Sequence, residues 1–148
     1  MVTLATVPFT QFHTSTIEVD ALEKRYTVDT LGAERQSFPG AEILFVVGTD
    51  MYQSIDTWKD FRRLFDLAHI VIVNRPGFPI REGVSPYRTL RPSEPVDLTS
   101  GNSVFFLPYV EQPISSTAIR DDRKRGGEVR QWLPPQVWSY IEKNNLYS

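Results

Sequence analysis

The sequence contains no cysteine, no long apolar run and no strong excess of charge of either sign. Without cysteine the chain forms no disulfide bonds and offers no thiolate for catalysis or metal binding. No apolar stretch approaches the ~20 residues that span a membrane, and the first residues lack the basic stretch and apolar core of a signal peptide. The net charge of −2 gives no general attraction to nucleic acid or anionic lipid. We therefore expect a cytoplasmic protein whose partners include neither nucleic acid nor a membrane.

The length and composition are ordinary for a globular protein. At 148 residues the chain has the size of one domain with a substantial core. Hydrophobic residues make up 41% and charged residues 23%, both close to the usual proportions. The protein could form a homo-oligomer, because composition does not report the oligomeric state.

Strand-like and helix-like segments alternate along the chain. Short apolar runs predict strands at residues 11–19, 43–47, 69–73 and 104–107. Helices are predicted at residues 29–37 and 58–67, and from Pro134-Pro135 to Lys143. Residues 43–47 are apolar at every position, which predicts a strand covered on both faces, and residues 78–103 predict a long connection. Strand, helix, strand, helix and strand in this order predict a parallel sheet with crossover helices.

Ligands bind at the carboxyl ends of the strands in such sheets, so the residues after each apolar run are candidates for a site. Gly48-Thr49-Asp50 follows the run that ends at Val47. A glycine lets a ligand approach the backbone, and a carboxylate accepts hydrogen bonds from ribose hydroxyls. Arg75 follows the next run and could meet a phosphate. Taken alone, these residues favour the alternatives, a turn with an aspartate helix cap and a solvated arginine beside a turn.

The segment Ile114-Ser115-Ser116-Thr117-Ala118-Ile119-Arg120 has the composition of a helix start. The first turn of a helix carries free N–H groups and a partial positive charge, and hydroxyls with a guanidinium add donors that suit a phosphate. The alternative is an ordinary serine or threonine cap with Arg120 as a solvated charge, and the segment alone favours it. Of the three apolar strands at residues 43–47, 69–73 and 104–107, the first and the last are thus followed by groups suited to a nucleotide.

Several motifs occur in one order along the chain. They are Tyr26-Thr27-Val28-Asp29-Thr30-Leu31, Gly48-Thr49-Asp50-Met51, Trp58, Arg75-Pro76-Gly77, Ile114 to Arg120, and the ending Leu133-Pro134-Pro135 with Tyr140-Ile141 and Leu146-Tyr147. In this order they resemble the bacterial nicotinate-nucleotide adenylyltransferases, nucleotidyltransferases of NAD synthesis, over essentially the whole chain. The resemblance implies a Rossmann-like α/β fold, a parallel sheet with flanking helices. It also implies adenylyl transfer from ATP to nicotinate mononucleotide, with Mg²⁺ as the cofactor because ATP brings it to such transferases.

For the mononucleotide, the resemblance implies roles for three residues. Trp58 would stack on the pyridine ring, which is physically reasonable because a flat, electron-poor ring pairs well with an indole. Tyr26 and Thr27 would help to hold the nicotinate carboxylate. The alternatives are core packing for Trp58 and helix capping for Thr27, and a capping role can coexist with binding.

For ATP, the resemblance implies a second group of residues. Gly48 and Asp50 would face the adenosine ribose, and Ser116, Thr117 and Arg120 would contact the phosphates or the adenylate end. Nucleotidyl transfer needs positioning and charge stabilisation more than covalent chemistry. Hydroxyls, a carboxylate and a guanidinium are side chains that supply both.

The histidine motif of the family is absent from the sequence. Members begin with a strand and a loop reading G-x-F-D-P-x-H-x-G-H, which grips the triphosphate, whereas the only histidines here are His13 and His69. By the resemblance, the first residues match the end of the helix that follows this loop, and a further strand element is missing as well. We therefore expect no catalytic residue of the family, and one nucleotidyltransferase-like domain over residues 1–148 that is incomplete at its N-terminal side. The strand at Ile43 should then have an open edge.

Two hypotheses of different classes follow. The first is an adenylyltransferase whose sequence here is truncated. The second is a non-catalytic remnant of that fold, which binds a nucleotide weakly or serves a structural role. A sister enzyme that adenylylates another phosphorylated substrate is disfavoured by Tyr26-Thr27 and by Trp58.

Overall fold

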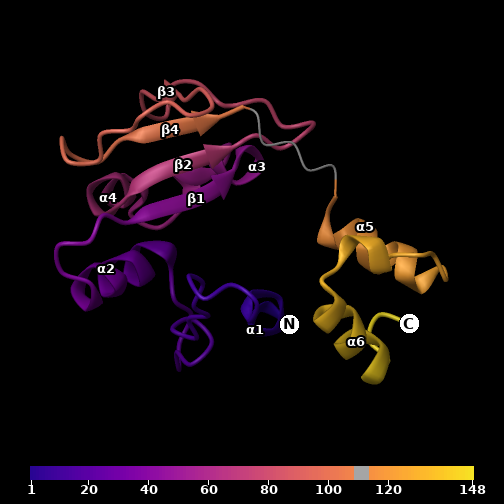
Figure 1. Cartoon of the computed structure of the whole chain (residues 1–148). Helices are drawn as coiled ribbons and strands as arrows, with labels where there is room; N and C mark the ends of the chain where they lie inside the picture. The colour runs from indigo at the N-terminus through magenta and orange to yellow at the C-terminus, as the bar shows by residue number, and fades with distance from the viewer. Residues whose placement is uncertain (109–113) are drawn as a thin grey trace. The chain divides into compact units, whose positions relative to one another are not determined.

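The computed structural model describes residues 1–108 and 114–148 and divides the chain into two compact units (Figure 1). One unit, which we call the helical unit, combines Met1–Thr16 with Ile114–Ser148. The other, the sheet unit, is Ile17–Pro113. The described strands all belong to the sheet unit.

The sheet unit is built around one parallel sheet of four strands. The strands are β1 (Leu44–Gly48), β2 (His69–Val73), β3 (Arg88–Thr89) and β4 (Val104–Leu107), in the order β1-β2-β4-β3 across the sheet. The register pairs Val46 with Val71, and Val71 with Phe105. Parallel neighbours need a crossover between them, and α4 (Phe61–Leu67) lies in the crossover from β1 to β2. The prediction of an α/β fold with a parallel sheet is confirmed.

Helices occur in both units. The sheet unit has α2 (Thr27–Ser37), α3 (Thr49–Tyr52), the 3₁₀ turn η1 (Ile55–Thr57) and α4; the helical unit has α1 (Val2–Thr6), α5 (Ser116–Lys124), the 3₁₀ turn η2 (Arg130–Trp132) and α6 (Pro135–Lys143). α6 begins at Pro135, because the fixed φ and missing N–H of proline suit the first position of a helix. After α2, Gly40 has a φ of 82° and turns the chain toward β1. The helices predicted from residue 29 and from Pro134-Pro135 are therefore confirmed.

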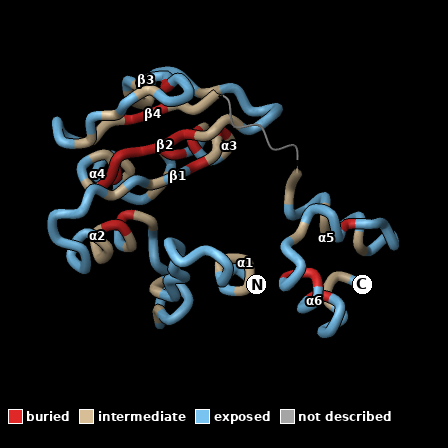
Figure 2. Tube along the Cα trace, in the orientation of Figure 1, coloured by how far each residue is buried: buried red, intermediate tan, exposed pale blue. Residues whose placement is uncertain are grey.

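The core of the sheet unit is centred on β2 (Figure 2). The first four residues of β2 are buried, because the strand has a neighbour on each side. Side chains from α2, α3, η1 and α4 pack against it; the residues are Val28, Leu31, Tyr52, Ile55 and Leu64. Burial of each large aliphatic side chain contributes about 1.5–3 kcal/mol, so this cluster sets the position of the strand ends.

The prediction that β1 is covered on both faces is wrong. Leu44 and Val46 are 47% and 58% exposed, whereas Val47 is buried. These two residues share one face of the strand because side chains alternate along it. β1 also lies at an edge of the sheet formed by the described strands. The open edge expected for this strand is thus observed.

Two further predictions differ from the structure. Residues 11–19 form turns and irregular backbone instead of a strand, with Phe12 and Val19 exposed. A strand needs a hydrogen-bonding neighbour, and the described strands all pair elsewhere. The helix predicted at 58–67 begins only at Phe61, because Asp60 has the left-handed backbone conformation (φ 48°). Trp58 lies before the helix in extended backbone.

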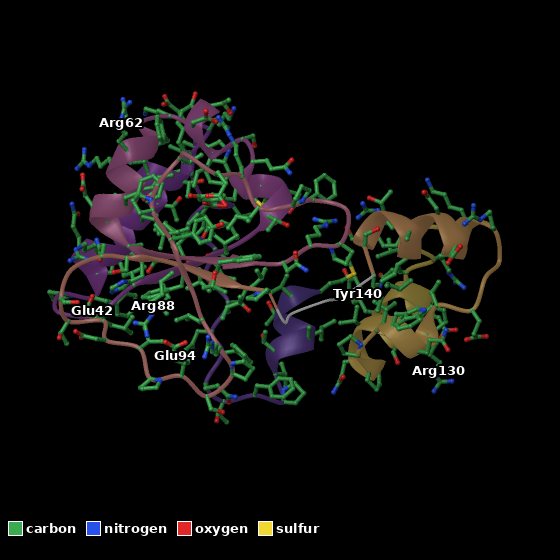
Figure 3. The ribbon with its side chains drawn as sticks, turned by 90° about the horizontal axis from the view of Figure 1, so that it is seen from above. Glu42, Arg62, Arg88, Glu94, Arg130 and Tyr140 are labelled. Atoms are coloured by element: carbon green, nitrogen blue, oxygen red, sulfur yellow. The ribbon has the colours of Figure 1, made fainter. Side chains whose placement is uncertain are left out.

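The long connection predicted at residues 78–103 is largely irregular, with one short strand, β3. Glu94 closes the turn that follows this strand. Its carboxylate accepts a hydrogen bond from the backbone N–H of Arg91 at 2.9 Å and pairs with the guanidinium of Arg88 (Figure 3). The Arg91 N–H and then Arg88 lower the pKa of Glu94. This turn places β3 beside β4.

Candidate functional site

The carboxyl ends of β1 and β2 are joined through Thr49 and Arg75. The parallel register places Gly48 opposite Val73, so the residues that follow the two strands meet. Thr49 is fully buried, and its hydroxyl accepts a hydrogen bond from the backbone N–H of Arg75 at 3.0 Å. The loop after β2 is therefore fixed to the end of β1.

Asp50 lies at the same edge and pairs with the side chain of Arg75. The Oδ2 atom of Asp50 is 2.5 Å from Nη1 of Arg75. The other oxygen, Oδ1, is buried and has no hydrogen-bond partner among the described residues. A Cβ atom on Gly48 would lie 2.4 Å from this Oδ1, so a side chain there would displace the carboxylate. The Asp50 carboxylate is therefore bounded by the backbone at Gly48 on one side and by the Arg75 side chain on the other.

Tyr26 and Thr27 lie at the start of α2, in a cluster of charged side chains. Tyr26 precedes the helix, and its ring is partly exposed. The ammonium groups of Lys59 and Lys24 lie 4.6 Å and 5.1 Å from the centre of this ring. Lys59 also contacts Asp29 at 3.4 Å. The site therefore carries two cations and one anion, an arrangement favourable for a carboxylate ligand.

The two lysines were not among the residues that the sequence singled out. Lys24 lies two residues before Tyr26, whereas Lys59 lies in the crossover from β1 to β2, between η1 and α4. Exposed lysines are common, and neither position has a spacing that marks it. Only the packing of the chain before α4 against α2 brings Lys59 to the tyrosine.

Trp58 packs into the core of the sheet unit. It is half-buried and lies edge-on to Phe45 of β1, with ring centroids 6.3 Å apart and an interplanar angle of 65°. This contact supports the core-packing alternative for part of the indole. A half-buried ring keeps an exposed portion, so stacking on a pyridine ring stays a prediction.

Ser116, Thr117 and Arg120 belong to the helical unit, on the first turns of α5. The cap of this helix is Ser115, whose Oγ accepts a hydrogen bond from the N–H of Ala118 at 3.1 Å. Ser116 and Thr117 are exposed. Arg120 approaches Thr117, with Nη2 at 3.5 Å from Oγ1, and lies 6.0 Å from the centre of the Tyr147 ring. The structure thus gathers the three predicted residues on one helix, and it assigns the capping role to their neighbour.

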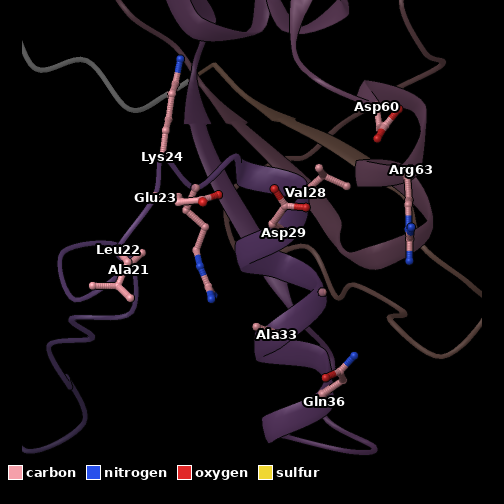
Figure 4. A pocket seen from close by; sticks show the side chains of 12 residues that line it. Ala21, Leu22, Glu23, Lys24, Val28, Asp29, Ala33, Gln36, Asp60 and Arg63 are labelled. Carbon is pink, nitrogen blue, oxygen red and sulfur yellow. The ribbon is translucent and has the colours of Figure 1, made fainter.

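A cavity of about 590 Å³ lies beside α2 in the sheet unit (Figure 4). Its lining residues are Ala21, Leu22, Glu23, Lys24, Arg25, Val28, Asp29, Gly32, Ala33, Gln36, Asp60 and Arg63. The three basic and three acidic side chains of this set give no preference for ligand charge. The cavity includes none of the residues that the sequence predicts to bind a ligand.

The described residues contain no group of three or more histidine, cysteine, aspartate or glutamate side chains able to hold a metal ion. A magnesium ion in such a site commonly has one or two protein carboxylates and several phosphate oxygens. An ion of this kind would therefore be carried mainly by its nucleotide. In the same part of the chain, the helices are too short or too polar to cross a membrane.

Comparisons with known proteins agree on one family. Residues 9–122 match the family model described as "Cytidylyltransferase-like". A Thermus thermophilus relative named "Probable nicotinate-nucleotide adenylyltransferase" is 40% identical over 147 residues, which cover 99% of this chain and 70% of the relative. A Corynebacterium jeikeium relative of the same name is 36% identical over 152 residues, covering 99% of this chain and 72% of the relative.

A likeness to solved structures supports the fold. The structure titled "Plasmodium falciparum nicotinic acid mononucleotide adenylyltransferase complexed with APC" superposes with a TM-score of 0.60 at 21% identity. The match covers 85% of this chain and 60% of that chain. A second structure of the Plasmodium falciparum protein, complexed with NaAD, gives a TM-score of 0.59. The sheet and its flanking helices are thus shared with these structures.

Proposed function

The chain belongs to the nicotinate-nucleotide adenylyltransferase family, and from this membership we propose that it serves adenylyl transfer from ATP to nicotinate mononucleotide. The products would be deamido-NAD and pyrophosphate. The observation that carries the proposal is the cluster of Gly48, Asp50 and Arg75 at the carboxyl ends of β1 and β2. Nucleotides bind at this edge of parallel sheets. Both compact units would belong to one nucleotidyltransferase-like domain.

Residues of each unit are assigned a role in ATP binding: Gly48 and Asp50 in the sheet unit for the ribose, and the start of α5 in the helical unit for the phosphates. Asp50 accepts hydrogen bonds from ribose hydroxyls, and Gly48 leaves room for its carboxylate. Ser116, Thr117 and Arg120 donate hydrogen bonds to the phosphates. A guanidinium beside developing negative charge stabilises it through charge-assisted bonds. Mg²⁺ bound to the ATP phosphates would neutralise part of their charge.

The mononucleotide side of the reaction uses the start of α2. Tyr26 and Thr27 hold the nicotinate carboxylate, with Lys24 and Lys59 adding positive charge around the tyrosine ring. The exposed part of Trp58 covers the pyridine ring. An anionic acid is attracted by this surplus of positive charge more than a neutral amide is.

The printed sequence supplies no histidine for the phosphate-gripping motif of the family. His13 is exposed, and His69 is fully buried at the start of β2, the end of the strand opposite to the proposed site. We therefore propose that residues 1–148 bind the substrates and that transfer also requires the motif G-x-F-D-P-x-H-x-G-H. The second hypothesis, a non-catalytic remnant, predicts that a nucleotide binds weakly or not at all.

A titration and an activity assay on the 148-residue protein test the proposal. We expect isothermal calorimetry to detect nicotinate mononucleotide and ATP with Mg²⁺, and we expect no deamido-NAD in the assay. Failure to bind either ligand at millimolar concentration would favour the remnant hypothesis. Turnover close to that of a full-length relative would refute the requirement for the histidine motif. The variant Asp50→Asn should weaken ATP binding and leave mononucleotide binding unchanged.

A further inference from the structure

The carboxylate of Asp50 is held in one orientation by groups on two sides. On one side, Oδ1 is buried against the backbone at Gly48, where a Cβ atom would lie only 2.4 Å away. On the other side, Oδ2 accepts a hydrogen bond from Nη1 of Arg75 at 2.5 Å. The carboxylate therefore presents only its Oδ2 edge to solvent, with a side chain that is 21% exposed.

The position of Arg75 is itself fixed from β1. Its backbone N–H donates a hydrogen bond to the buried hydroxyl of Thr49 at 3.0 Å, which attaches the Arg75 backbone to the residue that follows β1. Three contacts thus fix the Asp50 carboxylate. Gly48 leaves space for Oδ1, the Thr49 hydroxyl binds the backbone N–H of Arg75, and the Arg75 side chain binds Oδ2. A lone surface ion pair lacks this backbone anchor.

We propose that Arg75 is a positioning residue that orients the Asp50 carboxylate toward the ribose diol of the bound nucleotide. This inference rests on the function proposed above. A carboxylate oxygen has two acceptor directions, so Oδ2 receives Arg75 along one and a ribose hydroxyl along the other. A hydrogen bond from a hydroxyl to a carboxylate is stronger than one to a neutral acceptor, so the orientation of the carboxylate affects ribose binding. Arg75 thereby contributes to the choice of a ribonucleotide over a deoxyribonucleotide.

The test compares ATP with 2′-deoxy-ATP and 3′-deoxy-ATP, each with Mg²⁺, by calorimetry on the 148-residue protein. We expect the wild-type protein to bind ATP about tenfold more tightly than at least one deoxy form, since a hydrogen bond to a charged group is lost. In Arg75→Met this ratio should fall to about one, with little change in the affinity for the deoxy form. Arg75→Lys should restore only part of the ratio, because a point charge does not reproduce the planar donor fork.

Two further variants separate positioning from stability. Gly48→Ala keeps both charged residues but displaces the carboxylate, so it should lower the same ratio. Arg81→Met removes an arginine that pairs with Asp56 through two hydrogen bonds at 2.7 and 2.8 Å, and it should leave the ratio unchanged. Thermal denaturation of each variant shows whether the fold is retained.

The outcomes distinguish this inference from the proposed function. Wild-type protein that does not bind ATP overturns both. Wild-type protein that binds ATP and both deoxy forms equally overturns the inference and leaves ATP binding established. A wild-type ratio in folded Arg75→Met shows that Asp50 is oriented without the arginine, which also overturns the inference.

Discussion

The backbone N–H of Ser103 donates a hydrogen bond to Nδ1 of His69 at 3.2 Å. Because Nδ1 accepts, the proton of the neutral ring lies on Nε2, which is 3.3 Å from a carboxylate oxygen of Glu42. The ring is fully buried and stacks on Phe105 with centroids 6.0 Å apart. His69 thus links β2, the chain before β1 and the chain before β4. This role is structural.

Replacement of His69 should therefore lower stability without affecting ligand binding. In His69→Leu the Ser103 N–H loses its partner in a partly buried setting, which costs about 1 kcal/mol or more. The measurement is urea unfolding, with His13→Leu as the control, because His13 is exposed and its replacement should change the free energy of unfolding by less than about 0.5 kcal/mol. Equal stability of the two variants would contradict the structural role of His69.

The regular elements of the sheet unit could be predicted from local patterns. The apolar run at residues 69–73 became β2 with unchanged bounds, because a central strand is apolar at each position. The apolar residues at 11–19 gave no strand, because strand formation depends on a neighbour that a local pattern does not reveal. Asp60 interrupted the helical pattern that begins at Trp58 through its left-handed backbone, which sequence spacing does not show.

The candidate site could be predicted in part. The rule for carboxyl ends of parallel strands selected Asp50 and Arg75 separately. Their contact depends on the register of β1 and β2, which pairs Gly48 with Val73 and so places the residues two positions later side by side. The sequence of either strand alone does not reveal the register of the pair. The approach of Lys59 to Tyr26 likewise arises only from tertiary packing.

The ion pair between Asp56 and Arg81 predicts a pH-dependent contribution to stability. Hydrogen bonds from Arg81 lower the pKa of Asp56. Because the pKa is lower in the folded chain than in the unfolded chain, the contribution is present at neutral pH and is lost as the pH falls through the folded value. Asp56→Asn should be less stable than wild type at neutral pH, and the difference should vanish in acid. Urea midpoints measured against pH provide the test.

The contrary outcome for Asp56 is a constant difference across the pH range. That result would assign the effect to packing or to the turn before Trp58 instead of to charge. Arg81→Met removes the same pair from the other side and should show the same pH dependence. Because Arg81 also donates to the carbonyl oxygen of Gln53 at 2.6 Å, its replacement should lower stability further at every pH.

Trp58 is expected to serve both the core and the mononucleotide. In Trp58→Ala the contact with Phe45 is lost, and the free energy of unfolding should fall by roughly 2 kcal/mol, since the residue is only half-buried. Affinity for nicotinate mononucleotide should fall several-fold while ATP affinity is retained, because stacking contributes about 1 kcal/mol. Trp58→Phe should recover most of the stability. Calorimetry and thermal denaturation of both variants separate the two effects.

A loss of affinity for both ligands in Trp58→Ala, in proportion to the lower stability, would leave core packing as the only role. Trp132→Ala is the matched control, because Trp132 is 49% exposed and lies in the helical unit. Its replacement should change neither the mononucleotide affinity nor the unfolding of the sheet unit.

Arg120 should contribute to binding of the ATP phosphates. Its guanidinium lies beside the Thr117 hydroxyl on the first turns of α5, where charge-assisted bonds to phosphate contribute about 1.5–3 kcal/mol each. Arg120→Ala should weaken pyrophosphate and ATP binding roughly tenfold or more and spare the mononucleotide, and Arg120→Lys should recover part. Arg130→Ala, an exposed arginine on η2, is the control. Wild-type affinities in Arg120→Ala, measured by calorimetry, would show that Arg120 is a solvated charge.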